Sequence, residues 1–135
     1  GCESEKKLHI LLAEDNDLNA EILLEILNTS GFTTVRAVDG GEVVDLFEKS
    51  QPYEFDIILM DVQMPVRNGY EATKLIRRLN RPDAKTVTIY ACTANTFRED
   101  QDQARKIGMD GFIAKPIDVG KLMQKLGVKN KGEKI

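Results

Sequence analysis

The chain has 135 residues, of which 41% are hydrophobic and 30% are charged, and its formal net charge is −3. This length and balance suit one globular domain with a single hydrophobic core and argue against a disordered chain. Because no basic block is present and the apolar runs are far shorter than the roughly 18 residues of a membrane span, we expect no nucleic-acid partner and no membrane contact by this segment.

The first half of the chain predicts strands and helices in alternation. Residues 10–13 form a candidate strand, residues 33–37 are rich in β-branched side chains, and residues 55–60 are almost all apolar, as expected for a central parallel strand covered on both faces. A helix between the first two strands, ended by Gly31, is predicted by apolar residues at helical spacing. These residues are Leu18, Ile22, Leu23, Ile26 and Leu27. A second amphipathic helix is marked by Val43, Val44 and Phe47.

The second half continues the alternation. Met64-Pro65 and Asn68-Gly69 predict a loop over residues 64–69, and a third helix, a strand over 87–92 and a short strand over 111–114 follow. The third helix is supported by Tyr70, Leu75, Ile76 and Leu79. A capping box, Thr96-x-x-Glu99, predicts the start of a fourth helix, which Gly108 is placed to end. Asp118 is placed to cap a last helix that carries Leu122, Met123 and Leu126 and stops at Gly127.

Five strands that alternate with five helices predict an α/β fold, a flavodoxin-like doubly wound (βα)5 with a five-stranded parallel sheet. Right-handed crossovers and this length favour the strand order 2-1-3-4-5. The domain is predicted over residues 8–126, between charged tails at 1–7 and 127–135. The two cysteines, Cys2 and Cys92, make no disulfide framework, which favours a reducing, cytoplasmic setting, and Cys92 is expected to be a small buried hydrophobe.

Polar side chains stand where the predicted strands end. They are Glu14 and Asp15 after the first strand, Asp61 after the third, Thr93 after the fourth and Lys115 after the fifth. In open α/β sheets, ligands bind in the crevice outside the carboxyl ends of the strands. Since the first and third strands would be neighbours, three carboxylates would lie close together and repel unless a cation neutralises them. Oxygen ligands without a His or Cys cluster favour a hard ion, and we expect Mg²⁺.

This set of side chains suits phosphoryl transfer. With Mg²⁺ bound, one carboxylate can attack phosphorus to give an aspartyl phosphate, while Lys115 and Thr93 offer a positive charge and a hydroxyl to the phosphoryl oxygens. Taken singly, each residue has a simpler explanation: Asp15 as a helix cap, Asp61 as a turn residue and Lys115 as a surface charge. Their joint placement at the ends of four strands favours a site.

Four segments resemble the receiver domains of two-component response regulators, and the resemblance spans almost the whole chain. The segments are residues 10–16, residues 56–65 with Asn68-Gly69, residues 93–95 and residues 108–116. The resemblance implies that Asp61 is the phosphoacceptor and that Asp15 and Asp61 bind Mg²⁺ directly. It also implies that Glu14 assists through water, that the backbone carbonyl of Gln63 is a third protein ligand, and that Thr93 and Lys115 bind the phosphoryl group.

The resemblance further implies a cis peptide bond before Pro116 and a switch in which Thr93 moves toward the phosphoryl group while Phe112 turns inward. Phe112 fits the core of the fifth strand equally well, and both interpretations stay open. The Asp-Val-Gln-Met-Pro and Thr-Ala-Asn runs are similar to receivers of hybrid sensor histidine kinases. The implied phosphodonor is a histidine on a sensor histidine kinase or a histidine phosphotransfer domain, and self-association is expected to be a weak dimer at most.

Two other functions stay open. A haloacid-dehalogenase-like phosphatase uses an Asp nucleophile in an Asp-x-Asp pattern that Asp15-Asn16-Asp17 fits, although Asn19 stands where Thr or Val is expected and the length leaves no room for a cap domain. A degenerate receiver would bind partners without phosphorylation, against which the intact site residues argue. Whether the chain is an enzyme stays undecided: a receiver would be a self-phosphorylating and slowly self-dephosphorylating switch, and a hybrid parent protein would be a histidine kinase.

Overall fold

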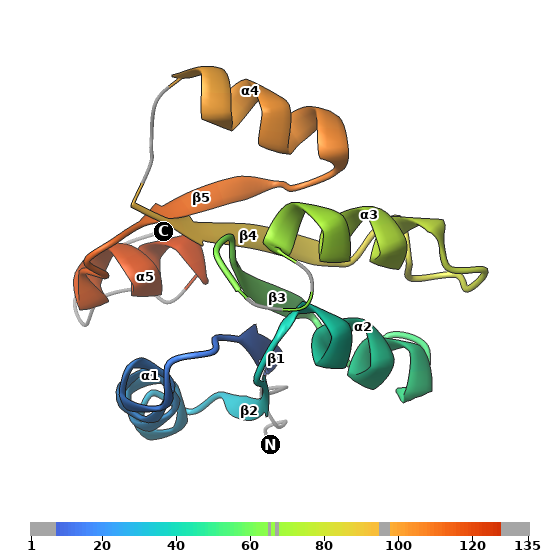
Figure 1. Ribbon diagram of the computed structural model, residues 1–135. Helices are drawn as coiled ribbons and strands as arrows, with labels where there is room; N and C mark the ends of the chain where they lie inside the picture. Colours follow the sequence, from blue (N-terminus) through green and yellow to red (C-terminus); the bar gives the residue numbers. More distant parts are fainter. Residues whose placement is uncertain (1–7, 65, 67, 95–97, 128–135) are drawn as a thin grey trace.

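A parallel sheet forms the centre of the computed structural model, which describes residues 8–64, 66, 68–94 and 98–127 (Figure 1). Its five strands run in the order β2-β1-β3-β4-β5, and every neighbouring pair is parallel. The strands are β1 (His9–Ala13), β2 (Thr33–Ala37), β3 (Ile57–Asp61), β4 (Thr88–Thr93) and β5 (Gly111–Ala114). The predicted fold class and strand order are therefore confirmed.

Helices cover both faces of the sheet (Figure 1). In the described part of the chain they are α1 (Asp17–Thr29), α2 (Gly40–Lys49), α3 (Gly69–Arg78), α4 (Arg98–Ile107) and α5 (Val119–Lys125). One hydrophobic cluster joins the sheet to α2, α3 and α4, and a second joins it to α1 and α5. None of these helices combines the length and the hydropathy that a membrane crossing requires.

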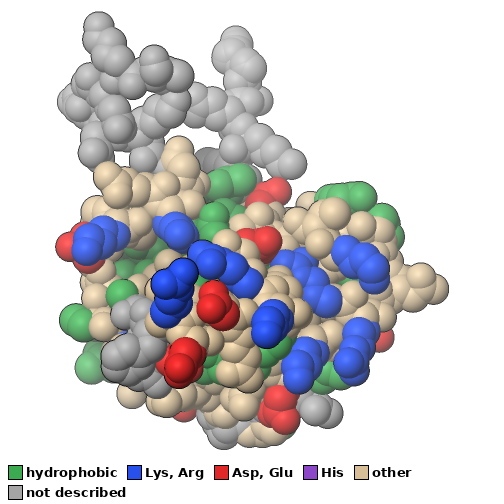
Figure 2. All heavy atoms as spheres, turned by 90° about the horizontal axis from the view of Figure 1, so that it is seen from above, with side chains coloured by type: hydrophobic (Ala, Val, Ile, Leu, Met, Phe, Trp, Pro, Cys, Tyr) green, Lys and Arg blue, Asp and Glu red, His purple; other side chains and the backbone are tan. Residues whose placement is uncertain are grey.

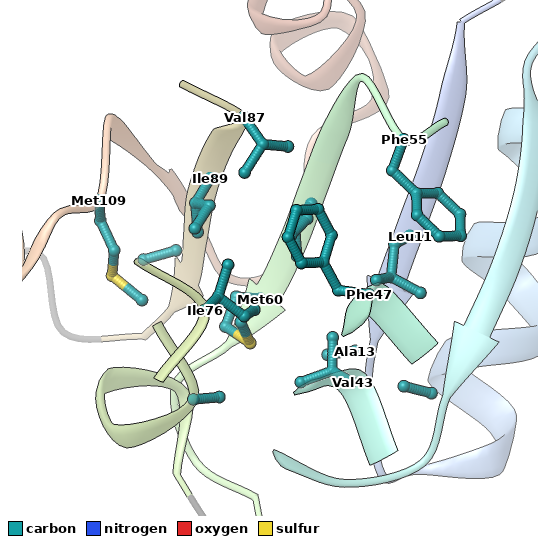
Figure 3. Packing of buried hydrophobic residues seen from close by; sticks show 14 of the residues in the cluster. Leu11, Ala13, Val43, Phe47, Phe55, Met60, Ile76, Val87, Ile89 and Met109 are labelled. Atoms are coloured by element: carbon teal, nitrogen blue, oxygen red, sulfur yellow. The ribbon is translucent and has the colours of Figure 1, made fainter. Parts of the chain in front are cut away.

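The central strand β3 is buried at all of its positions. Because successive side chains of a strand point to opposite faces, Ile58 and Met60 enter the first cluster while Ile57 and Leu59 enter the second. Figure 3 shows the first cluster, in which side chains of α2 and α3 lie against those of β1, β3 and β4. The apolar run of this strand thus predicts its burial on both faces correctly.

The predicted starts of three strands are wrong by one or two residues. β1 begins at His9 and not at residue 10, β3 at Ile57 and not at residue 55, and β4 at Thr88 and not at residue 87. β3 ends at Asp61 and β4 ends at Thr93, because Asp61 pairs with Cys92 and Thr93 pairs with Ala114 in the parallel ladder. The candidate site residues Asp61 and Thr93 are therefore the last residues of their strands. A backbone position held in a ladder is more rigid than one in a loop.

The apolar stripe predicted for α1 is partly wrong. Leu23 and Leu27 are buried, but Leu18 is 64% exposed and Ile22 is 50% exposed. At 100° per residue, Leu18 and Ile22 project from a different side of the helix than Ala20, Leu23 and Leu27, which face the sheet. The helix therefore presents apolar side chains to solvent as well as to the core.

The loop predicted over residues 64–69 is also shorter than expected. Asn68 is the N-cap of α3 and forms a capping box with Glu71, and Gly69 is already the first helical residue. Asparagine is favoured both in turns and at helix N-caps, so an Asn-Gly pair does not tell whether a loop continues or a helix begins. Thr96, predicted to open α4, and most of both charged tails lie outside the described residues. The helix-ending glycines Gly31 and Gly108 have positive φ, as predicted.

Charge is distributed unevenly over the fold. Between residues 8 and 64, Arg36 and Lys49 are the only basic residues of the sequence. Figure 2 shows the face seen from above in Figure 1, where Lys and Arg side chains gather among a few Asp and Glu side chains. Lys and Arg are therefore rare on β1, β2, β3, α1 and α2. Arg36, which lies on β2, is one of these two residues.

Candidate functional site

Three carboxylates meet at the carboxyl ends of β1 and β3. One carboxylate oxygen from each of Glu14, Asp15 and Asp61 lies within 4.8 Å of those of the other two. Glu14 is 3% exposed and Asp61 is 4% exposed, whereas Asp15 is exposed to solvent. The parallel pairing of Ala13 with Met60 places the residues that follow side by side. The structure thus brings together the three acids that the sequence places at these strand ends.

Among the described residues, one lysine, which directly follows β5, reaches this cluster. The Nζ atom of Lys115 lies 3.0 Å from Oδ2 of Asp61 and 3.8 Å from Oε1 of Glu14. Burial lowers the pKa of Lys115, but the hydrogen bond and the charge of Asp61, with the charge of Glu14, outweigh it and raise the pKa. Lys115 is therefore charged at neutral pH. The Lys115–Pro116 peptide bond is cis, the form that the resemblance implies.

The lysine does not neutralise the acids fully. Burial raises the pKa of Glu14 and the charge of Asp61 raises it further, while a hydrogen bond from the Asn16 backbone N–H and the charge of Lys115 lower it. The net result is a raised pKa, which means that the folded site disfavours the ionised form of Glu14. A cation placed among these oxygens would relieve that cost.

Thr93 and Gln63 also belong to this edge of the sheet. Thr93 is buried at the end of β4, and its carbonyl oxygen accepts a 3.0 Å hydrogen bond from the Lys115 backbone N–H, so these residues lie side by side. The backbone N–H of Gln63 donates to Oδ1 of Asp61 at 3.1 Å. One oxygen of Asp61 is therefore bound by a backbone amide while the other faces Lys115.

Gly69 fixes the distance between α3 and the end of β3. A Cβ atom at this position would lie 2.5 Å from the Asp61 carbonyl oxygen and 2.9 Å from Cγ of Met60, closer than van der Waals contact permits. Its backbone N–H donates to the Val62 carbonyl at 2.9 Å. Only glycine lets the helix begin this close to Asp61.

Arg36 is a site residue that the sequence does not single out. Its Nε and Nη2 atoms donate to the Glu14 carbonyl oxygen at 3.0 and 2.8 Å, and its Nη1 lies 2.9 Å from Oδ1 of Asp17. In the sequence it is one polar residue in a β-branched run, separated from Glu14 by 22 positions. The only available signal was its rarity, as a basic residue in an acidic half of the chain.

An apolar cavity of about 460 Å³ adjoins the acids. It is lined by Ile22 and Ile26 of α1 and by Pro116 and Ile117, and Glu14 and Lys115 lie at its border. Phe112 is half-buried on β5, packs against the larger core cluster and lines a second cavity of about 480 Å³. The structure therefore gives Phe112 both core contacts and space beside it.

Comparison with known proteins decides the family. The model of the response regulator receiver domain family matches residues 10–127. The chain belongs to this family. This receiver domain is 34% identical over 111 residues to the hybrid signal transduction histidine kinase I of Dictyostelium discoideum, covering 81% of the chain but 6% of that protein. It is 31% identical over 115 residues to the polar-differentiation response regulator DivK of Brucella anthropi, covering 85% of the chain and 89% of DivK.

Solved receiver domains share its fold. One is the receiver domain of the sensor histidine kinase PA1611 of Pseudomonas aeruginosa, with a magnesium ion coordinated in its active-site cleft, at 33% identity and a TM-score of 0.79 over 90% of this chain and 95% of that one. Another is the receiver domain of Saccharomyces cerevisiae Ssk1 in complex with the histidine phosphotransfer protein Ypd1, at 28% identity and a TM-score of 0.78 over 91% and 88%. The chain is a receiver domain of two-component signalling, and the phosphatase alternative is set aside.

Proposed function

We propose that this receiver domain accepts a phosphoryl group from a phosphohistidine onto Asp61 in a Mg²⁺-dependent reaction, and that the transfer switches a signalling state. One observation carries the proposal: the carboxylates of Glu14, Asp15 and Asp61 lie within 4.8 Å of one another, with the Lys115 ammonium 3.0 Å from Asp61. Carboxylates crowded in this way suit a divalent cation and a phosphoryl group together.

The donor set suits Mg²⁺. All three side chains offer oxygen, and Mg²⁺ is commonly bound through one or two carboxylates, water and phosphate oxygens. Asp15 and Asp61 would hold the ion directly, Glu14 through water, and the backbone carbonyl of Gln63 would be the remaining protein ligand. When bound, Mg²⁺ supplies neutralisation of the negative charge on the transferring phosphoryl group.

The chain's own groups then have distinct roles. A carboxylate oxygen of Asp61 attacks the phosphorus, an O–P bond forms as the P–N bond to the donor imidazole breaks, and the electron pair of that bond stays with the nitrogen. The Gln63 N–H holds Oδ1 of Asp61 in place. Lys115, whose pKa is raised, keeps its charge for one phosphoryl oxygen, and the Thr93 hydroxyl donates to another.

The switch would run from Thr93 to Phe112. Phe112 pairs with Ala91 in the β4–β5 ladder, two positions before Thr93 on β4. Movement of Thr93 toward a phosphoryl group would change the space beside the half-buried ring. The core contacts of Phe112 and the cavity that it lines support two positions for this side chain.

The partner would be a sensor histidine kinase or a histidine phosphotransfer domain. The solved complex of the Ssk1 receiver with Ypd1 supports this partner class. The exposed Leu18 and Ile22 of α1 give a partner an apolar surface next to the acids. Similarity to receivers of a hybrid kinase and of PA1611 supports a hybrid kinase subtype, and any dimer would be weak. The free, buried Cys92, whose pKa burial raises to about 12, supports a reducing, cytoplasmic setting.

Intact mass spectrometry after incubation with Mg²⁺ and acetyl phosphate tests the proposal. We expect the wild-type chain to gain one phosphoryl group, Asp61→Asn to gain none, and Asp15→Asn to gain far less at the same Mg²⁺ concentration. Asp45→Asn, an exposed acid on α2, is the matched control and should behave as wild type. An unchanged wild-type mass with Mg²⁺ present would favour a degenerate receiver that only binds partners.

A further inference from the structure

A guanidinium on β2 holds the peptide group that joins two of the three acids. Arg36 gives two hydrogen bonds, of 3.0 and 2.8 Å, to the single carbonyl oxygen of Glu14. That carbonyl belongs to the peptide bond between Glu14 and Asp15, which is planar. Two donors on one oxygen therefore fix the orientation of the plane from which the Asp15 chain continues. Arg36 reaches this oxygen because it pairs with Leu12 in the β1–β2 ladder, two positions before Glu14.

Two other hydrogen bonds of this turn involve the Glu14 and Asn16 N–H groups, which are not part of the Glu14–Asp15 peptide group. On one side the Glu14 backbone N–H donates to the Ala37 carbonyl at 3.1 Å, and on the other the Asn16 backbone N–H donates to Oε2 of Glu14 at 3.1 Å. Asp15 itself is exposed, so core packing does not hold its side chain. The hydrogen bonds from the guanidinium hold the backbone next to Asp15 in place, where core packing does not, and the exposed carboxylate projects from this backbone.

The charge of Arg36 does not explain its position beside the three acids. A positive side chain beside a cation site repels the cation, so on electrostatic grounds alone Arg36 should weaken metal binding. Its third nitrogen pairs with Asp17, which is 91% exposed, and such a pair at the surface is worth little. The side chain of Arg36 is only 20% exposed. Its planar guanidinium can give two hydrogen bonds of fixed geometry to one oxygen, which the single ammonium of lysine does not.

We propose that Arg36 is a positioning residue for the acidic site, which fixes the Glu14–Asp15 peptide plane so that the Asp15 carboxylate is oriented toward those of Glu14 and Asp61. The inference rests on the proposed Mg²⁺ site and adds a residue outside its ligand set. Arg36 contributes to the affinity for the ion although it carries the same sign of charge.

Mg²⁺ titration by calorimetry, without any phosphodonor, separates orientation from charge. Arg36→Lys keeps the charge and loses the fork, and Arg36→Met loses both. Because partners that orient metal ligands are worth about 10-fold in affinity, Arg36→Lys should bind Mg²⁺ about 10-fold more weakly than wild type. Arg36→Met also loses the charge that repels the ion, so it should bind more weakly than wild type but less weakly than Arg36→Lys binds. Arg105→Met, an exposed arginine on α4, is the control and should bind with wild-type affinity. Tighter binding by Arg36→Met, or unchanged binding by Arg36→Lys, would overturn the proposal.

Two further measurements distinguish positioning from general damage. In metal-free ¹⁵N NMR spectra of Arg36→Lys, the Asp15 amide resonance should move while those of the β3 core stay in place. With acetyl phosphate, the variant should need about 10-fold more Mg²⁺ for half-maximal phosphorylation and reach the wild-type rate at saturation; a lower maximal rate at unchanged Mg²⁺ dependence contradicts the proposal. If the wild-type chain binds no Mg²⁺, both the proposed function and the role of Arg36 are wrong. If the wild-type chain binds Mg²⁺ and is phosphorylated, and Arg36→Lys does both equally well, only the role of Arg36 is wrong.

Discussion

Buried carboxylates lie beside basic side chains at both ends of the sheet, but their pKa values shift in opposite directions at the two ends. At the amino end, the carboxylate of Asp83 is 2% exposed and meets both Nε and Nη2 of Arg81, at 2.6 and 3.1 Å. The Tyr53 backbone N–H adds a 2.8 Å hydrogen bond to the same carboxylate. At the carboxyl end, three carboxylates lie together, and the ammonium of Lys115 pairs with two of them, Asp61 and Glu14. One end holds a matched pair and the other an excess of acid.

The pKa values follow this difference. Burial raises the pKa of Asp83, but the hydrogen bond from Arg81, the Tyr53 N–H and the Arg81 charge outweigh it, and the net shift is downward. Burial and the neighbouring Asp61 leave the pKa of Glu14 raised. Burial raises the pKa of both acids, and the close Arg81 guanidinium with its hydrogen bonds reverses this for Asp83, whereas the contacts of Glu14 do not.

Arg81 also ties the amino end to α2. Its Nη2 donates to the Gln51 carbonyl at 2.9 Å, and its guanidinium lies 4.4 Å above the centre of the Phe47 ring. Arg81 therefore joins α2, the segment before β3 and the segment before β4. This is the arrangement of a structural anchor, whereas the groups at the carboxyl end would bind and release a ligand under the proposed function.

The largest expected effect is loss of the anchor. Arg81→Met leaves the buried Asp83 without its partner, and breaking a buried ion pair in this way costs about 3 kcal/mol. We expect a fall of that size in the free energy of unfolding, measured by urea denaturation without Mg²⁺. Arg105→Met, at an exposed position, should change it by less than about 0.5 kcal/mol. A loss below about 1 kcal/mol for Arg81→Met would show that the pair is not an anchor.

Mg²⁺ should stabilise the chain through the other end alone. A ligand that binds only the folded state adds about 2.7 kcal/mol at a concentration of 100 times Kd. Urea denaturation with and without Mg²⁺ at that concentration should show this gain for wild type and for Arg81→Met, and little gain for Asp15→Asn. An equal gain in Asp15→Asn would place the ion elsewhere.

The smallest expected effect concerns Glu14 in the absence of Mg²⁺. Because its pKa is raised in the folded state, that state binds more protons than the unfolded state from the ordinary glutamate value of about 4.5 up to the folded pKa. Stability due to Glu14 therefore falls as pH rises through this window and stays lower above it. Glu14→Gln should be more stable than wild type at pH 7 and lose this advantage at pH 4. Glu48→Gln, an exposed acid on α2, serves as control.

Asp83 should show the opposite dependence on pH. Its pKa lies below the ordinary aspartate value of 3.8, so its stabilisation is present above that value and is lost as pH falls through the folded pKa. Acid unfolding followed by circular dichroism should therefore show Asp83→Asn to be less stable than wild type at pH 7, with the difference shrinking below pH 4. A difference that stays constant down to pH 2 would mean that the charge of Asp83 is not what stabilises this end.

Most of the fold and the site could be predicted from the sequence because both depend on local patterns. The burial of β3 follows from an unbroken apolar run, and helix ends follow from glycines such as Gly31 and Gly108. Parallel strands joined by right-handed crossovers place all their carboxyl ends on one edge. The convergence of Asp61 and Lys115 therefore follows from chain order alone.

Contacts between distant residues could not be predicted in this way. Leu18 and Ile22 have the spacing of core residues, yet the side of α1 that meets the sheet is set by Ala20, Leu23 and Leu27. Because α1 carries apolar residues on two sides, the spacing alone does not tell which side packs against the sheet.

The sequence by itself determined the strands, their buried faces and the acids at their ends, since each depends on residues close together in the chain. The strand order followed from the alternation of strands and helices and from right-handed crossovers. Only the tertiary structure decided what the two long-range arginines, Arg36 and Arg81, contact. Arg36 reaches Glu14 across 22 positions and Arg81 reaches the Phe47 carbonyl across 34. Such contacts depend on strand register and helix placement, which fix how far a long, flexible side chain must reach and what it meets there.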